Sequence, residues 1–247
     1  MKRRSIALLC IVLSLIILQI NVRFSNAQEA VNLFDEILFQ TKSKTVEYGL
    51  TACFKTVEEP EEICNYLIRS LEFNNKEIKF KSIKDEDSYC IEFSGENVEG
   101  YIEALKYKKQ NDITINISKK GNENGLGALK NKVNESIGYR GKNIKYFQYL
   151  KAEIGKNVCA TGVKSSDAVG IEDIYVVNER IIKILKSHGT ENIETISINN
   201  GLTTIAYTGE YDEKINNNKL IDFNYAICNY SSGRYIIIGT PEIITTY

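Results

Sequence analysis

The feature that most constrains the fold is a residue pattern that occurs twice, 114 positions apart. An apolar residue recurs every four positions in two segments, which is typical of the buried stripe of a helix. The paired positions are Ile63 and Val177, Leu67 and Ile181, and Leu71 and Leu185. The same shift maps residues 91–96 onto residues 205–210, each an alternating strand followed by a Gly-Glu turn. One shift that aligns a helix and a strand favours a tandem duplication.

Each copy is predicted to contain a strand, a helix and four further strands, and the first copy adds a second helix. The first copy covers about residues 45–140 and the second about residues 141–247. Strands joined by short polar turns are antiparallel neighbours, and such sheets carry helices on one face and leave the other open. The predicted class is therefore α+β, with a curved antiparallel sheet backed by helices on one face. This is the outline of a TATA-box-binding-protein-like saddle.

The N-terminus reads as an export segment rather than as part of the folded body. Three basic residues at positions 2–4 precede an apolar stretch of 16 residues, Ser5 to Ile20, and Ser25-Asn26-Ala27 offers small residues for cleavage. The stretch is shorter than the roughly 20 residues that span a bilayer comfortably. Residues 1–27 are thus a cleaved signal peptide or a retained membrane anchor. Both place the body, residues 28–247, outside the cytoplasm.

Charge argues against nucleic acid as a partner. Four of the 31 basic residues lie within residues 1–27, which hold no acid, so residues 28–247 carry 27 basic and 32 acidic residues, a net charge of −5. Nucleic-acid binders draw most of their affinity from Lys and Arg that neutralise phosphates. The same argument opposes adhesion to anionic lipid, so contact with a membrane is expected only through the N-terminal segment.

The sequence offers little for catalysis, metals or cofactors, and none is predicted. His188 is the single histidine, and its place before Gly189 suits a helix end; a site that joined it to Cys159 or Cys228 is the weaker interpretation. The five cysteines of the body lack metal spacing and are read as buried small residues, with one or two disulfides left open. Paired carboxylates remain open as an alternative, although Glu96 and Glu210 follow glycines and read as turn residues.

The chain resembles the YwmB family, exported proteins of spore-forming Gram-positive bacteria that are classed as TATA-box-binding-protein-like by fold. The resemblance is most specific in the run Tyr235-Ile236-Ile237-Ile238-Gly239-Thr240-Pro241 and in the last residues, Thr245-Thr246-Tyr247. The export segment and the strand-then-helix start between Tyr48 and Leu71 are similar as well. The family brings no catalytic or cofactor-binding residues to transfer.

The open face of the sheet is the predicted binding surface. If Ile113, Ile115 and Ile117 face the helices, the alternating residues face outward. The predicted surface comprises Glu92, Thr114, Asn116, Asp222 and Asn224. The leading hypothesis is a non-enzymatic extracytoplasmic binding or accessory protein of the cell envelope, linked to envelope or sporulation processes, whose partner is an envelope protein or peptidoglycan. An envelope hydrolase with paired carboxylates and a structural scaffold of an envelope complex are the alternatives.

Overall fold

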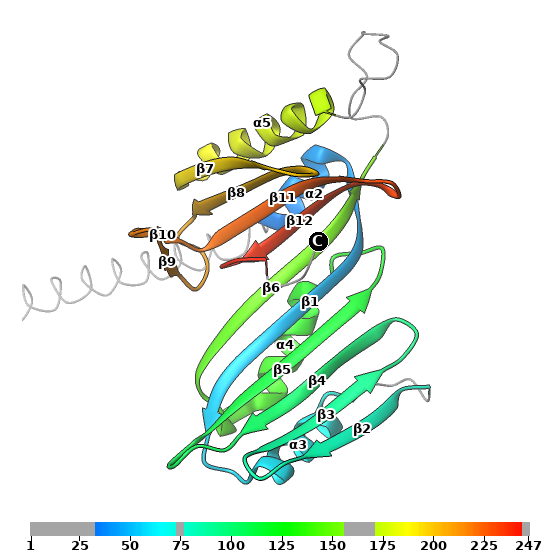
Figure 1. Cartoon of the computed structure of the whole chain (residues 1–247), viewed down its shortest axis with the longest axis vertical. Helices are drawn as coiled ribbons and strands as arrows, with labels where there is room; N and C mark the ends of the chain where they lie inside the picture. Colours follow the sequence, from blue (N-terminus) through cyan, green and yellow to red (C-terminus); the bar gives the residue numbers. More distant parts are fainter. Residues whose placement is uncertain (1–32, 73–76, 156–170, 244–247) are drawn as a thin grey trace, which may run out of the picture. The chain divides into compact units, whose positions relative to one another are not determined.

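A computed structural model describes residues 33–72, 77–155 and 171–243. The strands are β1 (Ser43–Thr56), β2 (Lys79–Lys84), β3 (Ser88–Ser94), β4 (Val98–Leu105), β5 (Asn111–Lys120), β6 (Lys142–Ile154), β7 (Glu191–Ile198), β8 (Gly201–Tyr207), β9 (Lys214–Asn216), β10 (Lys219–Ile221), β11 (Phe223–Tyr230) and β12 (Gly233–Thr240). Ten of them form one open sheet in the order β2-β3-β4-β5-β1-β6-β12-β11-β8-β7, shown in Figure 1. Every neighbouring pair is antiparallel. The predicted α+β class with a large antiparallel sheet is confirmed.

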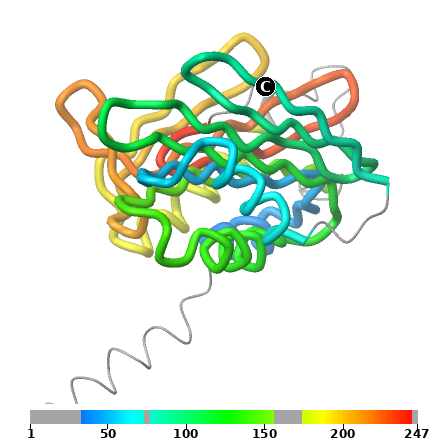
Figure 2. The backbone as a smooth tube through the Cα atoms, turned by 90° about the horizontal axis from the view of Figure 1, so that it is seen from below, coloured from blue at the N-terminus to red at the C-terminus, as the bar shows by residue number. Residues whose placement is uncertain are grey.

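The described helices are α2 (Leu33–Thr41), α3 (Pro60–Ser70), α4 (Leu126–Ile137) and α5 (Ile171–Ser187), with a 3-10 turn at Gly138–Arg140. Of these, α3, α4 and α5 lie on the same face of the sheet. Figure 2 shows α3 and α4 together beneath the strands. On α5, Asn178 accepts a 2.7 Å hydrogen bond from the Tyr225 hydroxyl of β11. The strand registers place Tyr225 on the same face as Leu150 of β6 and Tyr48 of β1, and therefore on the face that α3 and α4 cover.

The main core lies between α3, α4 and the strands β3, β4, β5 and β1. Ile113, Ile115 and Ile117 of β5 are at most 1% exposed, and they pack in one cluster with Leu67 of α3 and Val133 of α4. The intervening residues of β5 point to the other face, as the period-two alternation predicts. Pro60 is the first residue of α3, where its missing N–H removes no helical hydrogen bond. The predicted helix and strand stripes of this half are confirmed.

The 114-residue shift holds for the helices and fails for the strands. Val177, Ile181 and Leu185 of α5 are buried, as are their counterparts in α3. Ile91 of β3 packs in the helix-covered core, whereas Ile205 of β8 pairs with Asn224 on the opposite face. A strand that slips by one residue reverses all its side chains, so residues 205–210 do not match residues 91–96 position by position. The strand part of the 114-residue alignment was therefore wrong.

The second half also differs from the predicted unit in its strand count. Between β8 and β11 it inserts β9 and β10, which pair with each other in a separate two-stranded sheet. The long first strand of the second half, β6, runs from Lys142 to Ile154, and it pairs with β1 in the centre of the large sheet.

Some expectations fall on residues outside the described ranges. These are the export segment at residues 1–27, Cys159, and Thr245-Thr246-Tyr247. Within the described ranges, no helix has the length and apolar character needed to cross a membrane.

Candidate functional site

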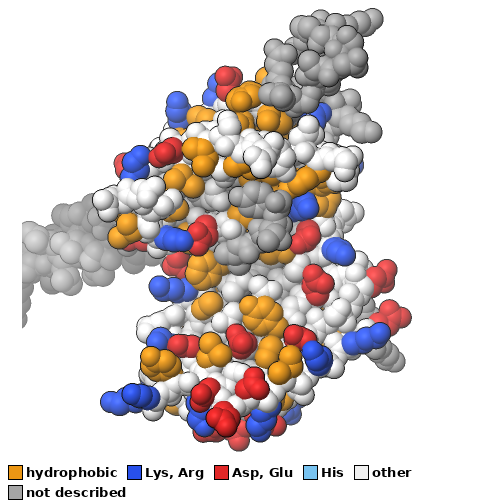
Figure 3. Space-filling model, viewed as in Figure 1, with side chains coloured by type: hydrophobic (Ala, Val, Ile, Leu, Met, Phe, Trp, Pro, Cys, Tyr) orange, Lys and Arg blue, Asp and Glu red, His pale blue; other side chains and the backbone are white. Residues whose placement is uncertain are grey.

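The open face of the sheet carries a row of side chains that crosses five strands, here termed the central row. It runs through β3, β4, β5, β1 and β6, and its members are direct neighbours in register. They are Glu92, Tyr101, Asn116, Thr51 and Phe147. Figure 3 views this face and shows apolar groups interspersed with acidic, basic and uncharged polar ones in the half below β1. The row is therefore a mixed aromatic and polar surface that no described helix covers.

Three of the predicted surface residues come together on this face. Glu92 is exposed and lies 3.3 Å from Lys81 of the edge strand β2. Asn116 donates a 2.8 Å hydrogen bond to Thr51 Oγ1 on the neighbouring strand. Thr114 lies one row away, and its hydroxyl contacts Cys53 Sγ at 3.9 Å. Glu92, Thr114 and Asn116 thus belong to one continuous patch, as the strand alternation predicted.

Asp222 does not belong to this patch, which corrects the sequence-based expectation. It is fully buried at the start of β11, where it holds the loop after β8. Its carboxylate accepts hydrogen bonds from Thr208 N at 2.6 Å, Thr208 Oγ1 at 2.8 Å, Glu210 N at 3.0 Å and Tyr211 N at 3.3 Å. Four donors from one loop give Asp222 a structural role in closing that loop.

Asn224 lies on the open face but is only 8% exposed. Its side-chain amide donates to Thr204 O at 2.8 Å, and its Oδ1 accepts from Ile243 N at 3.3 Å. The chain after β12 passes over this part of the face, where Ile243 also packs against the buried Cys228 and Ile237. The prediction that Asn224 offers an accessible surface was therefore wrong, because alternation along a strand does not show what later chain covers it.

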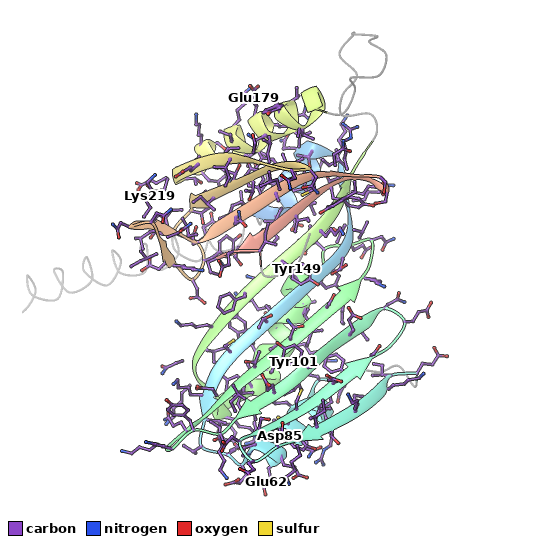
Figure 4. The ribbon with its side chains drawn as sticks, viewed as in Figure 1. Glu62, Asp85, Tyr101, Tyr149, Glu179 and Lys219 are labelled. Atoms are coloured by element: carbon purple, nitrogen blue, oxygen red, sulfur yellow. The ribbon has the colours of Figure 1, made fainter. Side chains whose placement is uncertain are left out.

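A buried tyrosine network that sequence inspection did not identify borders the central row. The Tyr149 hydroxyl lies 2.7 Å from both Glu47 Oε1 and Ser118 Oγ. A Cβ at Gly49 would overlap the Tyr149 ring, so the glycine on β1 makes room for it. Burial raises the pKa of Tyr149, which keeps the phenol protonated and donating. Tyr149 on β6 and Tyr101 on β4 mark the two sides of this part of the face in Figure 4.

The cysteines described by the structure are free and poorly suited to nucleophilic chemistry. They are Cys53, Cys64, Cys90 and Cys228. Burial raises the pKa of each thiol, and that of Cys64 reaches about 12. Because the thiolate is the reactive form, these cysteines are predominantly protonated at neutral pH.

Cys90 provides a test of this electrostatic environment. Burial is the main cause of its raised pKa, and the Glu103 carboxylate on the neighbouring strand is the next. Replacing Glu103 by glutamine removes a negative charge that disfavours the thiolate, so the Cys90 pKa should fall. We expect alkylation of Cys90 by iodoacetamide at pH 8 to become about threefold faster, as measured by peptide mass spectrometry. Glu96→Gln, in the turn after β3, serves as the control and should leave the rate unchanged.

His188 occupies a helix end, as predicted. It follows the last residue of α5, and Gly189 adopts a positive φ of 72°. Gly189 N donates to Lys186 O and Thr190 N to Leu185 O, each at 3.1 Å, which is a Schellman closure. The His188 ring lies 3.7 Å from Glu210 Oε1. Within the described residues, no cluster of three or more His, Cys, Asp or Glu side chains could hold a metal ion.

An acidic pocket of about 580 Å3 lies at the far end of the first half, around the start of α3 and the β2–β3 turn. Its carboxylates are those of Glu59, Glu61, Glu62, Asp85, Glu86 and Asp87. All six residues are exposed, and Lys84 forms a 2.7 Å ion pair with Glu61. In Figure 4, Glu62 and Asp85 mark this end of the structure. Because all six acids are exposed, none of them lies in the apolar surroundings that raise the pKa of a glycosidase general acid.

Comparison with known proteins gives no family assignment. No family model matches the chain, and no curated protein matches it significantly. Among solved structures, the crystal structure of DynU16, a protein of the dynemicin biosynthetic locus, aligns over 78% of this chain and 86% of its own, with 9% identity and a TM-score of 0.25. A TM-score this low supports no inference about fold or function.

Proposed function

We propose that this chain is a non-enzymatic extracytoplasmic binding protein of the cell envelope, and that the central row contacts the glycan strands of peptidoglycan. The observation that carries the proposal is the central row across five strands, in which Glu92 and Tyr101 are exposed, Asn116 and Phe147 are partly exposed, and Thr51 is buried beneath them. The extracytoplasmic location rests on the signal-like character of residues 1–27.

The side chains of the central row suit a sugar polymer. Tyr101 is 36% exposed, so part of its ring is available to stack on the apolar face of a sugar ring. The Glu92 carboxylate can accept hydrogen bonds from sugar hydroxyls, and the Asn116 amide can both donate and accept. A glycan strand is long and flexible, and an open sheet offers it contacts without an enclosed cleft.

The charges on this face oppose a nucleic-acid partner. Glu92 of β3 and Glu99 and Glu103 of β4 point to the same open face as Tyr101 of the central row. Lys81 is engaged with Glu92, and on the neighbouring strand pair Lys55 lies 3.3 Å from Asp112. Phosphates would meet several carboxylates on β3 and β4 rather than a continuous basic surface.

Co-sedimentation with isolated peptidoglycan sacculi tests the proposal. Tyr101→Ala should reduce the bound fraction of the purified chain about tenfold, because an aromatic anchor near the centre of a binding face carries a large share of the affinity. The matched control is Tyr175→Ala, which removes a 48% exposed tyrosine from α5. Equal binding by wild type and Tyr101→Ala would exclude this face as the glycan site. If an envelope protein crosslinks to the wild-type chain but not to the Tyr101→Ala variant, the face would instead be assigned to a protein partner.

We also propose that the two halves arose by duplication, in the manner of TATA-box-binding-protein-like folds and of the YwmB family that the sequence resembles. The strand order supports this. In the first half a long strand and a helix precede four strands, and β5 returns beside β1. In the second half β6 and α5 precede β7, β8, β11 and β12, and β12 returns beside β6. The two long strands, β1 and β6, then pair with each other at the centre.

A paired-carboxylate envelope hydrolase is the second candidate function, and the acidic pocket at α3 is the only observation that favours it. If the pocket hydrolysed glycosidic bonds, purified sacculi would release soluble muropeptides, and Glu62→Gln combined with Asp87→Asn would abolish the release. Absence of muropeptide release by the wild-type chain would dismiss this candidate without affecting the binding proposal.

A further inference from the structure

A second pocket, of about 460 Å3, opens on the helix-covered face and reaches the hydrophobic core. It lies where α3 ends and α4 begins, over the first residue of β4 and the end of β5. Leu71, Ile117 and Leu129 form its floor and belong to the main core cluster. Val98 and Ile78 are partly buried and complete the apolar wall. Ligand pockets typically have volumes of about 300–1,000 Å3, mostly apolar walls and a few placed polar groups.

Lysines supply the polar groups at the rim of this pocket. Lys119 follows Ile117 by two positions on β5, so its side chain points to the helix-covered face, between Val98 and Tyr48 on the neighbouring strands. Lys132 of α4 donates a 3.0 Å hydrogen bond to Glu72 O at the end of α3. Burial lowers the pKa of Lys119, and the nearby positive charge of Lys132 lowers it further. The two cations are therefore close enough to repel each other.

Glu72 also lines the pocket, but no ion pair within 4 Å joins its carboxylate, or that of another described residue, to Lys119 or Lys132. The lysines that do form ion pairs among the described residues lie on β1, β2, β9 and β10. Lys119 is half-buried at the end of a stripe whose preceding members, Ile113, Ile115 and Ile117, are apolar. Two neighbouring cations beside an apolar cavity are stabilised by an anion whose remainder is apolar.

We propose that this pocket binds a single-chain amphiphile with a carboxylate head group, such as a fatty acid. The acyl chain packs against Val98 and Ile78, above the buried Ile117 and Leu129, and the carboxylate accepts hydrogen bonds from Lys119 and Lys132. The pocket lies on the opposite face of the sheet from the central row. This inference is therefore independent of the proposed glycan contact.

Fluorescence titration with cis-parinaric acid tests the proposal on the full chain. The chain contains no tryptophan, so the probe's own fluorescence, which rises when it leaves water, is the signal. We expect saturable binding by the wild type. Lys119→Met should weaken it about tenfold, as should Lys132→Met, because each removes one charge-assisted hydrogen bond. Val98→Phe should weaken it as well, because it fills the cavity.

The controls distinguish binding in this pocket from nonspecific attraction of the acid to positive charge on the surface. Lys55→Met removes an exposed lysine on the open face and should bind the acid as the wild type does. The methyl ester of the probe, which lacks the charge, should bind the wild type and Lys119→Met equally. Circular dichroism melting curves that match the wild type establish that the variants are folded.

Three results would overturn the proposal. The first is no saturable signal with the wild type, and the second is binding of the acid that neither Lys119→Met nor Val98→Phe weakens. The third is a Lys119→Met effect on sedimentation with phosphatidylglycerol vesicles but not on cis-parinaric acid. That outcome would assign the lysines to a lipid surface instead of a pocket.

Discussion

Replacing Ile115 by alanine is expected to lower the free energy of unfolding by about 3–4 kcal/mol, the largest effect anticipated for a single core position. Ile115 is fully buried in the middle of β5, directly between Ala52 of β1 and Ile102 of β4. Both helices of the first half contribute to the same cluster above it. The backbone of a central strand cannot move inward to fill the space, so the cavity persists and adds to the lost transfer free energy.

Chemical denaturation measures this effect, and Thr114→Ala provides the matched control on the same strand. Thr114 faces the open side and is half-buried, so its truncation should change the unfolding free energy by less than about 1 kcal/mol. The contrast between adjacent positions tests which face of β5 is covered. Equal losses at the two positions would contradict the assignment of the helix-covered face.

Asp222→Ala is expected to destabilise the protein by about 3 kcal/mol. The buried carboxylate accepts four hydrogen bonds from the loop after β8, three of them from backbone amides. Alanine leaves these donors without their acceptor, and hydrogen bonds to a charged group are worth more than neutral ones. The loop also carries Asp212, which accepts from Tyr146 N on β6 at 3.3 Å. If the loop becomes less ordered, this hydrogen bond to β6 should be lost as well.

Asp85→Ala is the control for this substitution, because it removes an exposed aspartate from the β2–β3 turn. The unfolding free energy should stay within about 0.5 kcal/mol of the wild type. Hydrogen exchange should show faster exchange of the Glu210 and Tyr211 amides in Asp222→Ala alone. If Asp222→Ala proved as stable as Asp85→Ala, the loop would not depend on the carboxylate.

Local patterns predicted the elements of the first half well. The alternation Ile113, Ile115, Ile117 determined which face of β5 is buried, because successive side chains of a strand point to opposite faces. Gly189 predicted the closure of α5, since a helix cap depends on backbone geometry within one turn. Such signals survive in a single sequence because the interactions behind them are local.

A site residue was predicted correctly only where no segment from elsewhere in the chain covers it. Glu92 lies on β3, and Thr114 and Asn116 lie on β5; because β3, β4 and β5 are antiparallel neighbours joined by short turns, alternation alone places all three on one face. Asp222 and Asn224 have the same polar, alternating pattern. The loop at residues 208–211 surrounds the first of them and the chain at Ile243 covers the second.

Sequence periodicity was thus sufficient to predict the buried stripes of the first half and the α+β class, because 3.6-residue and two-residue periods follow from backbone geometry. Only the folded chain revealed that Ile205 of β8 faces the opposite side of the sheet from Ile91, the β1–β6 pairing and the covering of Asn224. Strand register and segment packing depend on contacts between residues far apart in the chain. Those contacts have no counterpart in local spacing, and they determine which polar residues remain accessible to a partner.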